Sequence, residues 1–451
     1  MQINIGEEKM DPFKYINSLS LFGSEGGYKP GLSRIKRLLE HLGNPQKKLK
    51  IIHIAGTNGK GSTAASIEGI YREAGYKTAL YTSPHFFHFN ERIRVNGRAC
   101  STYELSEITA EVKKAAEKIK KENYGQASFF EIVTAMAFLY FKNHNPDLVI
   151  LETGLGGRLD ATNVIKKPLL SIITNISLEH TEFLGDTLAE IAGEKAGIIK
   201  NNSKLITDVQ QQEALKVIKE TAEEKNTEFI ELNKEYELIT ASGGIKSSIL
   251  CIKKYDKEQE VYSLSLLGSH QARNAALALR TIEELNENYP VKKSDIKTAL
   301  KNIHWPGRMQ KISEQPLTIL DAAHNPAAFK ELVKNINDSS DEIKDIHLIF
   351  SILADKDLAG ILNELKNLYN DINFYLAENA SFRSISIDNL EREIKNKKFN
   401  YQSFENLTAA SRTACNSAAK SDLIIAAGSF NTVFEAGIEI MSKKIRGEEN
   451  E

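Results

Sequence analysis

The sequence predicts an α/β protein, and three observations lead to that fold class. Short apolar runs of strand length alternate with longer segments of helical period, beginning with LKIIHIAG and STAASIEGIYREAGY. The runs are nearly continuous in apolar residues, as expected for parallel strands that helices cover on both faces. The chain has 451 residues, too many for one hydrophobic core. We therefore expect two large domains.

The first domain is expected to contain a mainly parallel sheet. After the opening strand and helix come the strand KTALYTS, a loop, and the helical segments TYELSEITAEVKKAAEKIKKE and FFEIVTAMAFLYFKNH. The strands DLVILETG and LLSIITNIS follow. Between about residues 204 and 265 the runs become shorter and alternate, as in YELITA and SSILCI. This pattern predicts a small antiparallel sheet attached to the first domain.

A helix near residues 271–285 leads to NIHWPGRMQ, where Pro306 and Gly307 mark a break. We place the domain boundary there, which gives domains 1–305 and 306–451. Beyond it LTILDAAHNP, DIHLIFSILADKD, INFYLAEN and DLIIAAGSF read as strands, each followed by helical sequence. A second α/β domain is expected to complete the chain.

Composition narrows the class of function. The 58 Lys and Arg residues and the 60 Asp and Glu residues give a net charge of −2, which offers no basic surface for nucleic acid. The N-terminus lacks the pattern of a secretory signal, and FFEIVTAMAFLYF is too short to span a bilayer. Cys100, Cys251 and Cys415 are too few and too scattered for a disulfide framework or a cysteine zinc site. We expect a cytoplasmic protein that acts on small molecules, with no nucleic-acid or membrane partner.

The stretch IIHIAGTNGKGSTAA places a glycine-rich turn between a strand and a helix. Backbone N–H groups in such a turn, together with the helix dipole, can bind a phosphate, and Lys60 would add a full positive charge. The alternative is an ordinary glycine-rich turn with a surface lysine. A standard P-loop has its lysine directly before the serine or threonine, whereas Gly61 separates Lys60 from Ser62 here. We predict that the phosphates of a nucleotide bind Gly56, Thr57, Asn58, Gly59, Lys60, Gly61 and Ser62, and the resemblance described next implies that this nucleotide is ATP.

The sequence GTNGKGS resembles the phosphate-binding motif of folylpolyglutamate synthases and dihydrofolate synthases, a family of the Mur ligase superfamily. The resemblance covers nearly the whole chain. The segments that carry it, in family order, are KPGLSRIKRLLEHLGNPQ (29–46), YTSPHFFHFNERIRVNG (81–97), FFEIVTAMAF (129–138), LETGLGGRLDATNV (151–164), LEHTEFLG, IAGEKAGIIK, GSHQARNAALAL, WPGRMQ, LDAAHNP and ILADKD.

The resemblance implies a P-loop ATPase-like first domain and a Rossmann-like second domain. It also implies a reaction in which ATP phosphorylates a carboxylate and the amino group of L-glutamate attacks the acyl phosphate. Phosphorylation is a sensible activation, because a carboxylate is a poor electrophile and gathering so many anionic oxygens requires cations. By the same resemblance the protein is expected to be a monomer.

The resemblance assigns catalytic roles to Lys60, Glu152, His180 and Lys195, with Ser83, Glu152 and His180 as ligands of probably two Mg²⁺ ions. From position alone, Glu152 could be a solvated strand-end residue and His180 an ordinary loop histidine. In this superfamily the lysine matching Lys195 is carbamylated, which replaces a cation with an anion. A lysine on a helix is otherwise usually a surface residue.

The remaining matches concern the nucleotide and the substrates. Asn274, Arg308 and Asp321 match residues that meet adenine, phosphate and ribose, although capping explains Asp321 nearly as well. Phe130 and Asp160 match positions that hold the pterin ring, and Arg92, His324 and Ser429 match positions proposed to meet the incoming glutamate. Two departures are Ala322, which replaces a glycine, and AAGSF in place of a TGSL-like turn.

The resemblance implies an ATP-dependent glutamate ligase that serves both dihydropteroate and reduced folates. Folylpolyglutamate synthesis alone, or another Mur-type amide ligase, remains an alternative. The folate-side segment SPHFFHFNERIRVNG argues against a cell-wall precursor as substrate. A nucleotide-dependent switch would require an Asn-Lys-x-Asp element, but the nearest string, ADKD, lacks the asparagine.

Overall fold

A computed structural model describes residues 11–20, 31–242, 244–245, 247–254, 258–339 and 343–448. The chain divides into two compact units. The first unit comprises Met1–Glu235 and Leu277–Ala299, and the second comprises Tyr236–Ala276 and Leu300–Glu451. The domain boundary that we expect between residues 305 and 306 remains a prediction. Lys29 and Pro30, which begin the first matched segment, lie outside the described residues.

The described part of the first unit contains a sheet of eight strands in the order β4-β3-β2-β5-β1-β6-β7-β8. Its strands are β1 (Ile51–Ala55), β2 (Thr78–Tyr81), β3 (Ile93–Val95), β4 (Arg98–Ala99), β5 (Leu148–Glu152), β6 (Leu170–Ile173), β7 (Lys204–Thr207) and β8 (Glu228–Glu231). In the order from β2 to β8 neighbouring strands are parallel, and β3 and β4 add antiparallel pairs at one edge. The sequence analysis had assigned this edge to a loop, because strands of two or three residues are too short to show a period. The parallel arrangement was predicted for β1, β2, β5 and β6. The prediction was wrong for β7 and β8, which lie in the region 204–265 expected to be antiparallel, because such short strands show no clear period.

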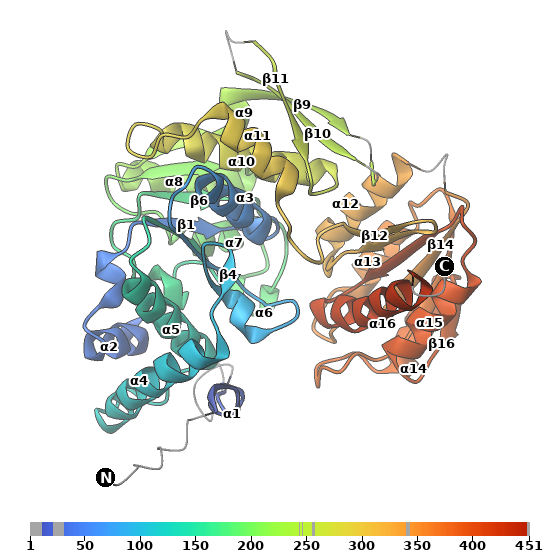
Figure 1. The fold of residues 1–451 in the computed structure, drawn as a ribbon, viewed down its shortest axis with the longest axis horizontal. Helices are drawn as coiled ribbons and strands as arrows, with labels where there is room; N and C mark the ends of the chain where they lie inside the picture. Colours follow the sequence, from blue (N-terminus) through green and yellow to red (C-terminus); the bar gives the residue numbers. More distant parts are fainter. Residues whose placement is uncertain are drawn as a thin grey trace. The chain divides into compact units, whose positions relative to one another are not determined.

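Helices cover both faces of this sheet (Figure 1). The apolar sides of α2, α4 and α5 form one core with residues of β1, β2 and β5, while α3 packs on the opposite face. The helices of the first unit are α1 (Pro12–Asn17), α2 (Ser33–His41), α3 (Lys60–Glu73), α4 (Thr102–Lys121), α5 (Phe129–His144), α6 (Thr181–Leu184), α7 (Leu188–Ala196), α8 (Gln212–Glu224) and α9 (Leu232–Glu235), with the short 3-10 helices η1 (Pro45–Lys48), η2 (Phe89–Arg92) and η3 (Ala161–Val164).

A small antiparallel sheet follows, with strands in the order β11-β10-β9. Its strands are β9 (Tyr236–Ser242), β10 (Ser248–Lys254) and β11 (Glu260–Leu264). The predicted antiparallel pairing is confirmed. The sheet belongs to the second compact unit, and α10 (Ser269–Leu285) then crosses from that unit into the first. α11 (Lys293–Asn302) crosses back.

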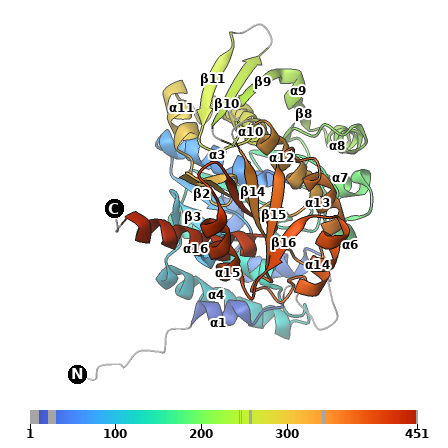
Figure 2. The same cartoon turned by 90° about the vertical axis from the view of Figure 1, so that its right-hand side faces the viewer.

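The second unit is built on a sheet whose described strands follow the order β12-β13-β17-β14-β15-β16. They are β12 (Gln310–Glu314), β13 (Leu317–Leu320), β14 (Asp345–Phe350), β15 (Asp371–Leu376), β16 (Asn400–Ser403) and β17 (Leu423–Ala427). Strands β14, β15 and β16 of this sheet are labelled side by side in Figure 2. All pairs are parallel except β12 with β13. The helices are α12 (Pro326–Asn337), α13 (Leu358–Leu365), α14 (Ile387–Asn396), α15 (Leu407–Ser417) and α16 (Phe430–Glu448). The predicted α/β architecture is confirmed in both units, although β12 and β16 were missed.

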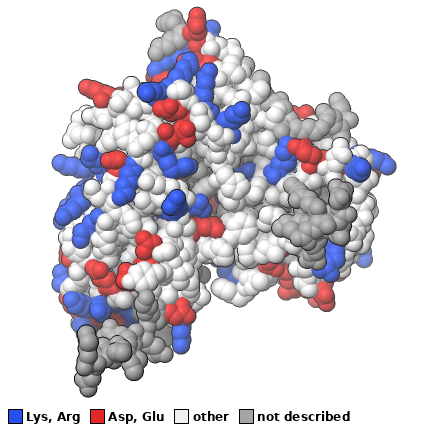
Figure 3. Space-filling model, viewed as in Figure 1, with Lys and Arg blue, Asp and Glu red and all other residues white. Residues whose placement is uncertain are grey.

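Charged side chains do not segregate on the visible surface. On the face shown in Figure 3, lysine and arginine are interspersed with aspartate and glutamate. This mixture agrees with a net charge of −2. Among the helices that the structure describes, none combines the length and the apolar character needed to cross a membrane.

Candidate active site

The turn between β1 and α3 leaves the start of a helix open. Gly56 and Gly59 have φ angles of 146° and 83°, in the region that favours glycine. A Cβ atom on Gly56 would lie 1.9 Å from the hydroxyl oxygen of Thr174, so only glycine fits there. Gly59 is the N-cap of α3 and has no side chain that could accept from the first-turn amides. Those amides lack intrahelical acceptors, which makes the helix start suited to an anion.

Two amides of this turn are already engaged within the protein. The N–H of Thr57 donates to the Asn175 carbonyl at 2.8 Å, and the N–H of Asn58 donates to Asn175 Oδ1 at 2.9 Å. The Thr174 hydroxyl donates to the Asn58 carbonyl at 2.7 Å. The loop after β6 therefore fixes the path of the turn. Of the predicted phosphate ligands, the amides of Lys60, Gly61 and Ser62 in the first turn of α3 suit the role better than those of Thr57 and Asn58.

Two lysines converge on one carbonyl oxygen in the turn. Lys60 Nζ donates to the carbonyls of Gly56 and Thr57, both at 3.0 Å. Lys195 Nζ, from the last turn of α7, donates to the same Gly56 carbonyl at 2.8 Å. The Lys195 side chain is buried rather than on the surface. Burial, followed by the charge of Lys60, lowers the pKa of Lys195 to about 7, so a large fraction of its amine is neutral at neutral pH.

Glu152 and Ser83 lie together at the carboxyl ends of the neighbouring strands β5 and β2. The backbone N–H of Ser83 donates to Glu152 Oε2 at 3.1 Å. Among the described residues, no group of three or more His, Cys, Asp or Glu side chains could hold a metal. A carboxylate beside a hydroxyl nevertheless provides the oxygen ligands that Mg²⁺ prefers, and Mg²⁺ commonly takes one or two protein ligands besides phosphate and water. The two residues therefore fit the ion.

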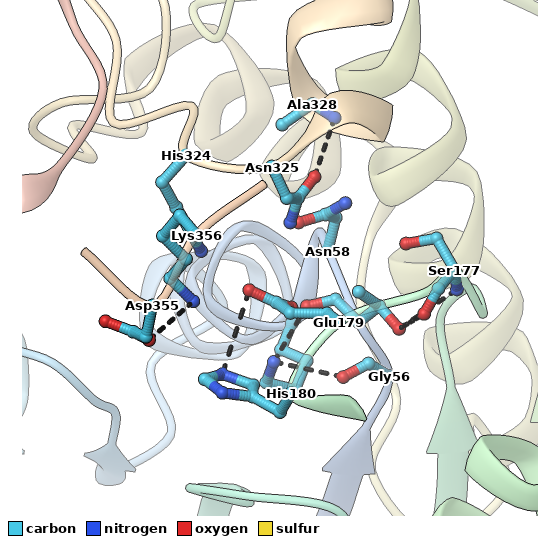
Figure 4. Close-up of polar contacts among 12 residues, drawn as sticks. Gly56, Asn58, Ser177, Glu179, His180, His324, Asn325, Ala328, Asp355 and Lys356 are labelled. Atoms are coloured by element: carbon cyan, nitrogen blue, oxygen red, sulfur yellow. Dashed lines mark hydrogen bonds and ion pairs between the residues drawn. The ribbon is translucent and has the colours of Figure 1, made fainter. Parts of the chain in front are cut away.

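His180 is adjacent to a carboxylate that the sequence analysis did not consider. Its Nε2 lies 3.7 Å from Glu179 Oε1 (Figure 4). His180 has a φ angle of 53° and is the N-cap of the short helix α6. The same loop is joined to the glycine-rich turn, because the N–H of Ser177 donates to Thr57 Oγ1 at 3.1 Å and that hydroxyl donates to the Ser177 carbonyl at 3.2 Å. His180 is thus held near the phosphate turn.

Asp160 organises the loop after β5. Its Oδ2 accepts the N–H groups of Gly154 and Leu155, both at 2.9 Å. Its Oδ1 accepts the N–H of Thr162 at 3.0 Å and the Thr162 hydroxyl at 2.5 Å. Burial raises the pKa of Asp160, while these four hydrogen bonds oppose that shift. The carboxylate expected to contact a pterin ring is therefore already hydrogen-bonded on both oxygens.

Phe130 lies against the same loop and keeps a partly exposed ring. A Cβ on Gly154 would come within 2.4 Å of Phe130 Cζ, so the ring packs directly on the glycine backbone. Tyr81 lies on another side, with ring centroids 6.2 Å apart. The structure thus brings Phe130 and Asp160 together through Gly154, and an aromatic face beside a polar loop is suited to a flat heterocycle.

Arg92 is buried among aromatic rings in the first unit. Its guanidinium carbon lies 5.4 Å from the Phe129 ring centre and 5.8 Å from that of Phe89, in cation–π geometry. Its Nε donates to His85 Nδ1 at 2.9 Å. These contacts fix the Arg92 side chain beside Phe129, the residue that precedes Phe130 in the chain.

In the second unit, three predicted residues gather at the start of α16. The guanidinium of Arg308 lies 4.8 Å from the centre of the Phe430 ring, and the imidazole of His324 lies 6.1 Å from it. Ser429 precedes Phe430 and accepts the N–H of Thr432 at 3.0 Å, which caps the helix start.

Asp321 and Asn274 lie in the same unit. Asp321 accepts the N–H groups of Met309 and Ala323 at 2.7 and 2.8 Å, so it fixes the residue that follows Arg308. Its charge also acts on His270 at the start of α10. Asn274, one turn along α10, donates to Gln271 Oε1 at 2.9 Å. Ala322 is buried, and its N–H donates to the Gly307 carbonyl at 2.8 Å, so the methyl group is accommodated.

The sequence is similar to known proteins over both compact units. Residues 54–282 match the family model described as Mur ligase middle domain, and residues 307–430 match Mur ligase, glutamate ligase domain. The chain is 41% identical over 351 residues to the dihydrofolate synthase/folylpolyglutamate synthase of Bacillus subtilis, which covers 77% of this chain and 81% of that protein. The chain belongs to the folylpolyglutamate synthase/dihydrofolate synthase family. It is therefore an ATP-dependent ligase.

Solved structures of this family share the fold. The Escherichia coli protein described as FolC in complex with DHPP and ADP has a TM-score of 0.85 and 29% identity, covering 96% of this chain and 99% of that one. A bifunctional folylpolyglutamate synthase/dihydrofolate synthase with Mn, AMPPNP and L-glutamate bound has a TM-score of 0.80 and 30% identity, covering 95% and 97%. The similarity extends over both compact units of this family member.

Three residues of the site were missed by the sequence analysis. Asn175 holds two amides of the phosphate turn, Glu179 lies beside His180, and His53 contacts Thr162 under the Asp160 loop. Asn175 and Glu179 follow a predicted strand, at the sheet edge where ligand-binding groups gather, and that signal could have identified them. His53 lies inside a predicted strand, and nothing in its position distinguishes it from a core residue.

Proposed function

We propose that this ligase adds L-glutamate to dihydropteroate and to reduced folates, with ATP as the phosphoryl donor. The observation that carries the proposal is the convergence of Lys60 and Lys195 on the Gly56 carbonyl at an open helix start. The family relationship supports it, since the Bacillus subtilis relative is named for both activities. A monomer is the oligomeric state that we propose.

In the first step, a carboxylate oxygen of the acceptor attacks the γ-phosphorus of ATP, and the bond to the β-phosphate oxygen breaks. The products are an acyl phosphate and ADP. The amides at the start of α3 and the Lys60 ammonium stabilise the charge that develops on the transferred group. Mg²⁺, held by Glu152 and Ser83 with His180 beside a second ion, would neutralise the phosphate oxygens.

In the second step, the neutral amino group of L-glutamate attacks the acyl carbon. The carbon–oxygen bond to phosphate breaks, an amide forms, and the amine loses a proton as inorganic phosphate leaves. Arg92, His324 and Ser429 are the residues proposed to meet glutamate. Phe130 provides an aromatic face for the pterin, and Asp160 shapes the loop beneath it. For the nucleotide, Asn274 is assigned to adenine, and Arg308 and Asp321 to phosphate and ribose.

Lys195 is proposed to carry a carbamate in the active enzyme. Its neutral amine would attack carbon dioxide and lose a proton, giving an anionic group on a long stem. The depressed pKa supports this step, because only the unprotonated amine is nucleophilic. The carbamate nitrogen would keep one hydrogen for the Gly56 carbonyl, while its charge would attract Lys60 instead of repelling it.

The decisive experiment is an acceptor screen with purified protein. ADP release should require both L-glutamate and either dihydropteroate or tetrahydrofolate, and mass spectrometry should show products heavier by glutamyl units. Omission of glutamate and the Lys60→Ala variant are the controls. Turnover with tetrahydrofolate alone would remove the dihydrofolate synthase activity. Turnover with a UDP-linked cell-wall precursor and with no folate would overturn the proposal.

A further inference from the structure

His53 is a buried polar residue in the middle of an apolar strand. It lies on β1 between Ile52 and Ile54, and its side chain is inaccessible to solvent. Burial, with a smaller effect from the charge of Lys200, lowers the pKa of His53 to about 3. The imidazole is therefore neutral at physiological pH and has one N–H to donate.

The hydrogen bonds around His53 determine which nitrogen carries that proton. Thr162 Oγ1 lies 2.5 Å from Asp160 Oδ1, and both Asp160 oxygens accept backbone N–H groups. Asp160 Oδ1 is the acceptor in this contact, so the Thr162 hydroxyl donates its proton to Asp160. The hydroxyl oxygen then accepts from His53 Nε2, 2.9 Å away. His53 is thus the Nε2–H tautomer.

The other ring nitrogen of His53, Nδ1, lowers the stability of the fold. Nδ1 is buried and has no hydrogen-bond partner among the described residues. A buried acceptor without a partner destabilises a protein, whereas an apolar residue, as at Ile52 and Ile54, would avoid the loss. Stability alone therefore does not favour histidine at this position. Its Nε2–H bond to Thr162 is the contact that an apolar residue could not make.

The contacts continue from Thr162 to the proposed acceptor site. Asp160 receives the Thr162 hydroxyl on one oxygen and the N–H groups of Gly154 and Leu155 on the other. Gly154 in turn supports the Phe130 ring, against which an added Cβ would clash at 2.4 Å. Thr162 and Asp160 are buried, Leu155 and Phe130 are half-buried, and Gly154 is exposed. His53 is thus connected through three residues to the aromatic face proposed for the pterin.

We propose that His53 is a positioning residue for the acceptor, which acts by orienting the Thr162 hydroxyl and, through it, the Asp160 carboxylate and the loop under Phe130. The identity of the acceptor as a pterin rests on the proposed function. The series of hydrogen bonds from His53 to Gly154 does not depend on the proposed function. His53 touches no substrate in this account, and the ATP turn is held by other residues, Thr174 and Asn175 among them.

Kinetics can separate this role from a structural one. His53→Leu removes the donor and should raise the KM for the pterin acceptor by roughly 10- to 100-fold, with the KM for ATP changed by less than about 2-fold. Thr162→Val should have the same effect, and the double variant should be no worse than either single variant. His53→Gln can place an amide N–H near the Nε2 position and should restore most of the affinity.

His347 provides a matched control. It is also a buried strand histidine, with ring nitrogens 2.9 Å from the Tyr375 hydroxyl and 3.2 Å from Asp422 Oδ2. His347→Leu should lower the melting temperature without a selective rise in the acceptor KM. If His53→Leu is folded and leaves the acceptor KM unchanged, or raises the KM of ATP and acceptor equally, the inference is wrong.

A measurement without substrate distinguishes this inference from the proposed function. Amide hydrogen exchange at Gly154 and Leu155 reports the Asp160 hydrogen bonds directly. Exchange should be at least several-fold faster in His53→Leu than in the wild type and should be restored in His53→Gln. Unchanged protection in His53→Leu would overturn the positioning role. Faster exchange in a protein that turns over no folate would support the positioning role and refute the proposed function.

Discussion

The two compact units each contain a strand-to-helix turn with predicted nucleotide ligands, and the two turns end differently. Between β1 and α3 the N-cap is Gly59, which has no side chain. Between β13 and α12 the N-cap is Asn325, whose Oδ1 accepts the N–H of Ala328 at 2.9 Å, and Pro326 follows at the first helical position. One helix start is open and the other is closed.

The difference suits the two turns to different chemical groups. An open helix start presents backbone amides and the helix dipole, which suit a phosphate group. At the closed start Pro326 has no N–H and Asn325 occupies that of Ala328, so fewer amides are available, and we expect the Asp321 side chain to meet the nucleotide there. Substitutions at four positions would test this contrast.

Lys60→Ala should cause the largest loss, because the open turn would bind phosphate without its full positive charge. We expect kcat/KM for ATP-dependent amide formation to fall by about 1,000-fold or more. ADP release in a coupled assay measures the loss, and the thermal unfolding midpoint is the control for folding. A variant that keeps near-normal turnover would contradict the phosphate role of the turn.

Lys195→Ala should reduce turnover by about 100-fold, and small carboxylates such as acetate should restore part of it. In the wild type, bicarbonate should activate the enzyme above pH 7. Because the Lys195 pKa is about 7, the neutral fraction falls about tenfold for each pH unit below it. Activation by bicarbonate should therefore be lost between pH 7 and 6. Insensitivity to bicarbonate across this range would exclude the carbamate.

The same pKa has a consequence for stability with a definite sign. The folded-state pKa of Lys195 lies below its unfolded value, so the unfolded chain binds more protons between about pH 7 and 10. The contribution of Lys195 should therefore make the fold more stable as pH rises through this range. Lys195→Met should remove that contribution, which chemical denaturation at several pH values can measure.

Gly56→Ala should destabilise the open turn, because the new Cβ would overlap the Thr174 hydroxyl and because the φ angle is 146°. We expect a loss of about 1–3 kcal/mol in the free energy of unfolding. Gly75→Ala is the matched control, since Gly75 has a φ angle of 92° and open space around it. Equal losses in the two variants would show that the overlap with Thr174 costs nothing.

Asn325→Ala should have the smallest effect, because it removes the cap of the closed turn and leaves the open turn unchanged. The expected loss is about 1 kcal/mol. Asn406 caps α15 with the same geometry, accepting the N–H of Ala409 at 2.9 Å. Asn406→Ala should therefore cost a similar amount in urea denaturation. A loss for Asn325→Ala of several times that amount would mean that the closed turn depends on Asn325 for more than capping.

Features formed by residues close together in the sequence could be predicted, whereas contacts between distant residues could not. The open turn was predicted because glycines, lysine and the helix start lie within a few residues of one another. The burial of Lys195 was not predicted, because a lysine in a helix is usually solvated. Its contact with the Gly56 carbonyl joins residues 139 positions apart in the chain, which no local pattern reveals. The short apolar neighbours in IAGEKAGI were the one local sign of burial.

Asp160 illustrates a second limit. The sequence suggested a carboxylate available to a ligand, whereas the structure shows it bonded to Gly154, Leu155 and Thr162. Hydrogen bonds of this kind depend on the path of the loop, which composition and period do not specify. His53 was overlooked for a related reason, because its importance comes from its contact with Thr162, 109 positions away.

The interleaving of the two compact units constrains how the molecule can be divided. The chain passes between the units at residues 235/236, 276/277 and 299/300, and the second and third of these crossings lie within α10 and α11. A single cut at any position therefore cannot release both units intact. Separate expression of the first unit would require joining residue 235 to residue 277, which would remove the small antiparallel sheet and the first half of α10.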